Sequence, residues 1–229
     1  MAENWRHVLY FVIGVLPPFF FGSRSLLQWI QSEREKKSVV GVLFWKLSIC
    51  GNVLLALHYF IQFQYPFLFI QVVNAFIAWR NLNLLQKKKE PLSSLRAVSI
   101  LISLLIVVNL LSSFQSFLSP IKTSFFSPPV GRMWSIKLDT HLLWHIFGLI
   151  GGVLFASRFW IQWIQAERKQ QSFLGTYFWM MSLLGGVCCL FYFVHILDWI
   201  SAAHHSLGMI PYLRNLSLIR AAKTSKFST

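Results

Sequence analysis

Hydrophobic and polar positions divide the chain into long apolar runs separated by short polar or basic segments. About 20 apolar residues suffice to cross ~30 Å of hydrocarbon as an α-helix that rises 1.5 Å per residue. Alternation of apolar and polar residues, the mark of a membrane strand, is absent. The pattern therefore predicts an all-α membrane protein with about seven transmembrane helices, at residues 7–31, 39–62, 66–85, 94–118, 141–165, 174–197 and 200–219.

The chain contains an internal repeat. The segment SRSLLQWIQSER at 23–34 returns as SRFWIQWIQAER at 157–168, 134 positions later, as from Arg24 to Arg158. The same offset, without a gap, relates RNLNL at 80–84 to RNLSL at 214–218. Chance similarity between apolar segments does not keep so many polar identities in one register, so the sequence indicates a duplicated unit of three helices.

The run 94–118 belongs to neither copy and sets the orientation of the two copies. Three crossings plus this one make four, so both copies enter the membrane from the same side, as in SWEET-type carriers. The prediction is two parallel three-helix repeats plus a linker helix, a 3+1+3 plan. Its parts are a first repeat at 1–86, the linker at 87–119, an extracytoplasmic loop at 120–140, a second repeat at 141–220 and a cytoplasmic tail at 221–229.

Charge supports this plan. The formal net charge is +14 and the mean hydropathy +0.56. Basic residues lie between apolar runs and not on one face of a soluble core, which argues for membrane lipids as partners and against nucleic acid. They gather in segments that fall on one side of the seven-helix plan, at 34–37, 87–96, 168–169 and 220–226. The positive-inside rule makes this side cytoplasmic, with the N-terminus outside and the C-terminus in the cytoplasm.

The candidate functional residues are arginines that lie inside the apolar runs. Arg24 and Gln28 lie one turn apart on one helix face, and Arg158 and Gln162 repeat the arrangement. An ionised arginine at the bilayer centre costs about 2.5–3.5 kcal/mol, which favours a protein-facing position. Guanidinium forks suit phosphate. We therefore predict an anion-binding cavity that also includes the pairs at the end of each third helix, Arg80 with Asn81 and Arg214 with Asn215.

The same residues also fit roles that need no ligand. Long side chains such as Arg80 and Arg214 can reach the headgroups. Hydrogen bonding between packed helices accounts equally well for the polar stripes of the third helices, namely Gln71, Asn74 and Asn81, then His205, Tyr212 and Asn215. Glu33 and Glu167, beside basic neighbours at helix ends, are expected to form surface ion pairs. The sequence shows no catalytic set, no metal-ligand spacing and no cofactor motif.

The longest matching segments are FFGSRSLLQWIQSEREKKSVVGVLFWKLSICGN and LFASRFWIQWIQAERKQQSFLGTYFWMMSLLGG. With the closing segments FIAWRNLNL and YLRNLSL, they resemble the lipid A biosynthesis N-terminal domain family. That module occurs ahead of some lipid-A-disaccharide synthases and also alone, and it is grouped with PQ-loop and SWEET-like membrane proteins. The resemblance implies a multi-pass protein of the bacterial inner (cytoplasmic) membrane, of Gram-negative type, that serves lipid A biosynthesis.

Residues and resemblance together lead to a functional expectation. The protein would bind or transport a phosphorylated lipid or sugar intermediate, an anionic lipid or a lipid A precursor, with the four arginines holding the anionic group. Alternatively it would be a membrane anchor or partner of a lipid A pathway glycosyltransferase, or part of a complex with lipid-A-disaccharide synthase activity. No segment of this sequence resembles the glycosyltransferase domain, so we expect no glycosyl transfer by these residues themselves.

Overall fold

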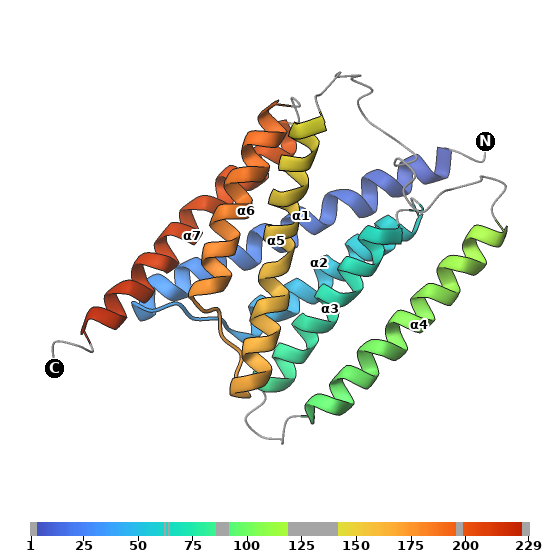
Figure 1. Cartoon of the computed structure of the whole chain (residues 1–229). Coiled ribbons are helices and arrows are strands. Elements are labelled where there is room, and N and C mark those ends of the chain that lie inside the picture. Colours follow the sequence, from blue (N-terminus) through green and yellow to red (C-terminus); the bar gives the residue numbers. More distant parts are fainter. Residues whose placement is uncertain are drawn as a thin grey trace. The chain divides into compact units, whose positions relative to one another are not determined.

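The computed structural model describes residues 4–61, 63, 65–85, 92–118, 142–195 and 199–225, and these form helices and no strand (Figure 1). Every predicted apolar run forms one helix, which confirms the all-α class. The predicted loop 120–140 and the basic residues Lys87, Lys88, Lys89, Lys122, Arg132, Lys137 and Lys226 lie outside the described residues. The helices are α1 (Asn4–Glu35), α2 (Val42–Ile61), α3 (Tyr65–Leu85), α4 (Ser94–Leu118), α5 (Leu142–Lys169), α6 (Thr176–His195) and α7 (Trp199–Ser225).

Five helices in the described part of the chain are long and apolar enough to cross a membrane. They are α2, α3 from Phe67, α4, α5 from Ile146, and α6. Helices α1 and α7 are not among them, and they carry polar residues within their length, such as Gln28 in α1 and Arg214 in α7. The protein is thus an all-α membrane protein, and the membrane crossing of α1 and α7 stays a prediction.

The first of two compact units comprises residues 1–24 and 42–135. Within it, α2 and α3 form a hairpin whose turn places Phe63 at φ 58°, and α4 runs beside α3 (Figure 1). The Tyr65 hydroxyl donates to Gln115 Oε1 at 3.3 Å, so the start of α3 meets the end of α4. At the other end, Arg80 Nη1 donates to the Leu92 carbonyl at 2.7 Å. Helix α4 is therefore antiparallel to α3 and parallel to α2.

The second unit comprises residues 25–41 and 136–229. It contains α5, α6, α7 and the last part of α1, which the sequence repeat assigns to the first copy. Helices α5 and α6 approach closely at glycines. A methyl group at Gly185 would lie 2.6 Å from the backbone nitrogen of Phe155 and 2.9 Å from the carbonyl of Gly151. The absence of a side chain at Gly185 therefore lets the two backbones touch.

The repeat is visible in local contacts as well as in sequence. Helices α1 and α5 are both followed by a residue with positive φ, Lys36 at 51° and Gln170 at 48°. Each pair of contacts below is separated by the 134-residue offset found in the sequence. Trp29 Nε1 donates to Glu33 Oε1 and Trp163 Nε1 to Glu167 Oε1; Gln28 Nε2 donates to the Val39 carbonyl and Gln162 Nε2 to the Phe173 carbonyl; Ser48 donates to the Phe44 carbonyl and Ser182 to the Phe178 carbonyl.

Candidate anion site: two buried arginines

Arg158 lies on α5 in the interior of the second unit, with only 7% of its surface exposed. Its Nη1 donates to Ser182 Oγ at 3.4 Å and to the Tyr212 hydroxyl oxygen at 3.3 Å. The Ser182 hydroxyl itself donates to the Phe178 carbonyl at 2.6 Å, so its oxygen lone pairs are available to the arginine. Both bonds from Arg158 are long, and both acceptors are neutral.

Aromatic rings surround the Arg158 guanidinium. Its carbon lies 3.5 Å from the centre of the Phe155 ring and 4.9 Å from that of Phe159, with Phe178 and Tyr212 further away. Within the described residues, Arg158 forms no ion pair and its Nε has no hydrogen-bond partner. Among the described residues, only ring faces and two hydroxyls therefore offset the cost of burying the charge of Arg158. An anion stabilises a buried cation far better.

Arg24 occupies the matching place in the first unit. It is also 7% exposed, and its Nη1 donates to Ser48 Oγ at 2.8 Å. Its guanidinium carbon lies 4.6 Å from the Phe21 ring centre and 5.3 Å from that of Phe44. These partners precede those of Arg158 by 134 positions. The two sites differ at two points, because Ser25 and Ala78 stand where the second copy has Phe159 and Tyr212.

The predicted glutamines and asparagines are buried and bonded to protein. Gln28 Nε2 donates to Asn215 Oδ1 at 2.9 Å, and Asn215 Nδ2 donates back to Gln28 Oε1 at 3.3 Å, which links the last part of α1 to α7. Gln162 holds the α5–α6 connection through the Phe173 carbonyl at 3.2 Å. Asn81 donates to the Ile77 carbonyl, one turn earlier, at 2.9 Å. The Gln28–Asn215 pair therefore joins two packed helices, whereas Asn81 bonds within its own helix and Gln162 bonds to the segment between α5 and α6.

Arg80 and Arg214, at matching positions in sequence, have different partners. Arg80 is fully buried and donates to Asn83 Oδ1 at 2.6 Å as well as to the Leu92 carbonyl, so it fixes the start of α4. Arg214 forms a two-pronged ion pair with Glu33, through Nε with Oε1 and through Nη2 with Oε2 at 2.8 Å. The structure thus gives each of these two arginines a definite protein partner.

Glu33 lies beyond the apolar run 7–31, and its pKa is lowered from 4.5 to about 2, first by the hydrogen bond from Arg214. Trp29 Nε1 also donates to it at 3.2 Å, and Lys36 Nζ lies 4.0 Å away. The expected surface ion pair with a basic neighbour therefore exists with Lys36. The stronger bond, to Arg214 on α7, is outside the prediction, because adjacency in sequence does not identify a partner 181 positions away.

Sequence reasoning also missed the hydroxyl partners of the two deep arginines. Ser48 and Ser182 are identical at the repeat offset, and Tyr212 belongs to a polar stripe, so their positions carried a signal that pattern alone did not link to Arg24 or Arg158. No group of three or more histidine, cysteine, aspartate or glutamate residues placed to hold a metal occurs in the part of the chain that the structure describes.

Apolar helices and a three-helix unit repeated in sequence and in contacts define a duplicated helical membrane protein with a buried arginine in each copy. The chain belongs to the Lipid A Biosynthesis N-terminal domain family, whose sequence profile matches residues 13–83 and again residues 147–217. The two matched segments begin 134 positions apart, as Arg24 and Arg158 do. No solved structure matches the chain.

Several curated relatives carry the name lipid-A-disaccharide synthase. The chain is 36% identical to that of Chlamydia felis over 93% of its own length, 34% identical to that of Chlamydia caviae over 96%, and 35% identical to that of Chlamydia muridarum over 90%. These matches cover 33%, 35% and 33% of the respective relatives, so the chain spans about a third of their length. Family and relatives together place the protein in lipid A biosynthesis.

Proposed function

We propose that the protein binds a phosphorylated lipid or sugar intermediate of lipid A biosynthesis, with Arg158 and Arg24 each able to receive an anionic group. One observation carries this proposal. Arg158 is 7% exposed, and among the described residues it has no ion pair and an Nε without a hydrogen-bond partner. Such a cation costs stability in an apolar helix bundle, and a phosphate would remove that cost.

The chemistry of the site suits a phosphate oxygen. Guanidinium offers five N–H donors in a planar fork, and Ser182 and Tyr212 engage only Nη1. The remaining donors can bind two oxygens of one phosphate, and the surrounding rings exclude water and strengthen the attraction. Because Arg158 is almost covered, a ligand enters only if Tyr212 or Phe155 moves aside. Movement of α7 away from α5 within the second unit would supply that opening. Rocking of one three-helix unit, the natural motion of repeated carriers, would extend binding to transport.

Not all four predicted arginines enter the proposed site equally. Arg80 and Arg214 already have protein partners, Leu92 and Glu33, and they stabilise the helix bundles around the site. We also propose that the protein lies in the bacterial inner membrane with its N-terminus outside and its C-terminus in the cytoplasm. The basic segments then face the cytoplasm, where they attract the anionic headgroups of the inner leaflet.

A second function has its own support. The relatives named lipid-A-disaccharide synthase are about three times as long as this chain, so the matched region accompanies an enzyme in one polypeptide. The protein would then be a membrane anchor or partner for such a glycosyltransferase, without catalysis by the residues described here. In that case the exposed basic residues near the helix ends, such as Arg168, would matter more than the buried arginines.

The test uses the full chain in lipid nanodiscs, with dioleoyl phosphatidic acid and glucosamine 6-phosphate as lipid and sugar probes. Loss of charge-assisted hydrogen bonds costs about 1.5–3 kcal/mol of binding free energy. R158Q should therefore weaken the binding of at least one of the two probes by roughly 10- to 100-fold. R158K keeps the charge but lacks the planar fork of donors, so its affinity should lie between those of the unaltered chain and R158Q. R168Q removes an exposed arginine at the end of the same helix and serves as the control.

R158Q, the matching first-copy variant R24Q and the control R168Q also separate the two functions. If R158Q and R24Q bind both probes as the unaltered chain does, the anion site is rejected. If these variants also capture lipid-A-disaccharide synthase from detergent extracts as well as the unaltered chain does, and R168Q does not, the anchor function is favoured. Formation of a disaccharide by the purified chain would contradict both functions.

A further inference from the structure

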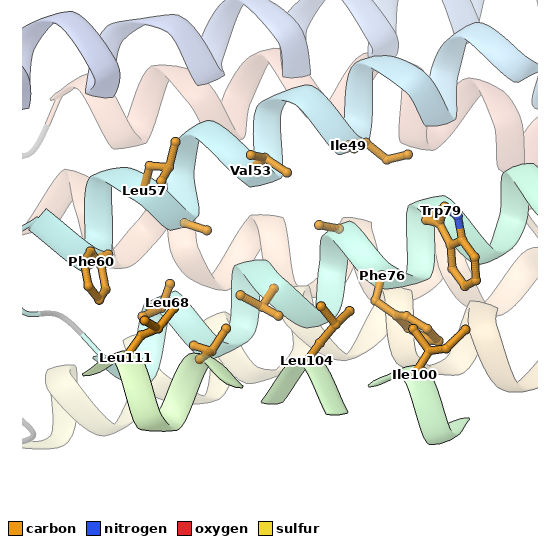
Figure 2. Close-up of a pocket in the computed structure, with 14 residues that line it drawn as sticks. Ile49, Val53, Leu57, Phe60, Leu68, Phe76, Trp79, Ile100, Leu104 and Leu111 are labelled. Carbon is orange, nitrogen blue, oxygen red and sulfur yellow. The ribbon is translucent and has the colours of Figure 1, made fainter. Parts of the chain in front are cut away.

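An apolar groove of about 560 Å³ runs between α2, α3 and α4 in the first unit. Every residue that lines it is alanine, valine, leucine, isoleucine, phenylalanine or tryptophan. Figure 2 shows side chains from all three helices pointing into it. Its two ends are marked on each helix by the pairs Ile49 and Phe60, Trp79 and Leu68, and Ile100 and Leu111.

The length of the groove matches one lipid leaflet. The lining spans eleven residue steps on each helix, from Ile49 to Phe60 on α2 and from Ile100 to Leu111 on α4. At 1.5 Å per residue this is about 16 Å, close to half of the ~30 Å hydrocarbon core. One extended acyl chain of a membrane lipid therefore fits along the groove, whereas a second transmembrane helix would exceed it at both ends.

The two ends of the groove differ chemically. At the Phe60 end, Tyr65 donates to Gln115, and Gln115 Nε2 donates to the Phe60 carbonyl at 3.0 Å, so a polar link between helices closes it. At the opposite end, two exposed basic residues lie one helical turn beyond the apolar lining. Lys46 precedes Ile49 by three positions, and Arg96 precedes Ile100 by four, so each shares a helix face with the lining residue that follows it.

We infer that this groove holds one acyl chain of an anionic membrane lipid, whose phosphate lies at the Lys46 and Arg96 end. Lipid tails are apolar everywhere, so the apolar lining alone gives little preference over the surrounding bilayer. Selectivity comes from the two cations, which should each favour an anionic headgroup over a zwitterionic one about fivefold. Trp79, 36% exposed at the same end, suits the headgroup boundary.

This site is separate from the arginine site proposed above. Arg24 contacts α2 through Ser48, which shares a helix face with Asn52, whereas the groove uses the neighbouring face with Ile49 and Val53. The groove proposal therefore does not depend on a phosphate at Arg24 or Arg158. Each proposal can fail while the other holds.

The test uses the full chain in phosphatidylcholine vesicles that contain a small fraction of phosphatidylglycerol with a diazirine near the end of one acyl chain. After illumination, the labelled residues are mapped by mass spectrometry. Label is expected on groove residues near Phe60 and Leu111, with a higher yield than for the matching phosphatidylcholine probe. K46Q and R96Q should each lower the phosphatidylglycerol yield about fivefold.

Two tryptophan substitutions on α4 form a matched pair. L104W places an indole in the groove and should abolish most of the labelling, whereas I102W, on the opposite side of the helix, should leave it unchanged. If L104W fails to fold, the map of the unaltered chain decides alone. Equal labelling of the Leu104 and Ile102 sides, equal yields from the two lipid probes, or a chain-to-chain cross-link through the groove would overturn the inference.

Discussion

The guanidinium carbon of Arg158 lies 3.5 Å from the centre of the Phe155 ring, one helical turn earlier on α5. The ring covers the guanidinium, and Ser182 and Tyr212 on neighbouring helices accept hydrogen bonds from its Nη1. A preorganised fork loses little side-chain entropy when it binds an anion. The same preorganisation leaves a charge in an apolar bundle when no anion is bound, and this cost can be measured.

Removing the charge of Arg158 should stabilise the ligand-free protein. R158M keeps a long apolar side chain against the rings and removes a burial cost of up to about 3 kcal/mol on membrane-insertion scales. We expect a higher thermal unfolding midpoint in detergent, together with loss of anion binding. R158K keeps the buried charge, so its unfolding midpoint should not rise. A lower midpoint for R158M would mean that the arginine serves mainly to support the fold.

The close approach of α5 and α6 gives a prediction about packing. In G185A the added methyl group would meet backbone atoms of Phe155 and Gly151, which cannot move aside easily. Overpacking of this kind costs about 1–3 kcal/mol of unfolding free energy. The control is G152A on α5, where no atom lies within 4 Å of the new methyl group and helix propensity improves by up to about 1 kcal/mol. Equal unfolding midpoints for the two variants would contradict the observed contact.

Much of the fold could be predicted because membrane crossing is a local property of the chain. The apolar run 94–118 coincides with α4, and the run 66–85 agrees with α3 to one residue. By contrast, α7 extends to Ser225, six residues beyond its apolar run, since a helix can continue in polar residues where hydropathy has no signal. The sequence repeat also places all of α1 in the first copy, although residues 25–41 belong to the second compact unit.

For the candidate site, the sequence could predict which residues share a helix face but not which partners they bond to. Spacing correctly put Arg24 and Gln28 on one inward face of α1, and burial agrees with that placement. Spacing could not show that Arg24 bonds to Ser48 while Gln28 bonds to Asn215, which lies 187 positions away. Partner choice depends on how distant helices pack, and a single sequence contains no direct record of this.

Arg80 should behave in the opposite way to Arg158. It joins the end of α3 to the start of α4 through Asn83 and Leu92, so R80M should lower the unfolding free energy by about 2 kcal/mol. Amide hydrogen exchange in the first turn of α4, at Ala97 for example, should become faster. L95A, a change at an exposed side chain of that turn, should leave the exchange rate as it is. Unchanged amide exchange in R80M would show that the hydrogen bonds of Arg80 do not stabilise the start of α4.

The ion pair of Glu33 with Arg214 predicts a pH dependence in the second unit. The pKa of Glu33 is lowered from 4.5 to about 2, so its contribution to stability is complete above pH 4.5 and is lost as the pH falls toward 2. The unfolding midpoint of the unaltered chain should therefore exceed that of E33Q at pH 7, and the difference should shrink below pH 4.5.

The matched control for this pH dependence is E167Q. Glu167 accepts the corresponding hydrogen bond from Trp163, at 3.0 Å, so E167Q reports the effect of weakening that bond. Arg214 makes its two-pronged contact with Glu33, so R214Q should reproduce the pH profile of E33Q. Parallel pH profiles for the unaltered chain and E33Q would show that this ion pair does not stabilise the contact between α1 and α7.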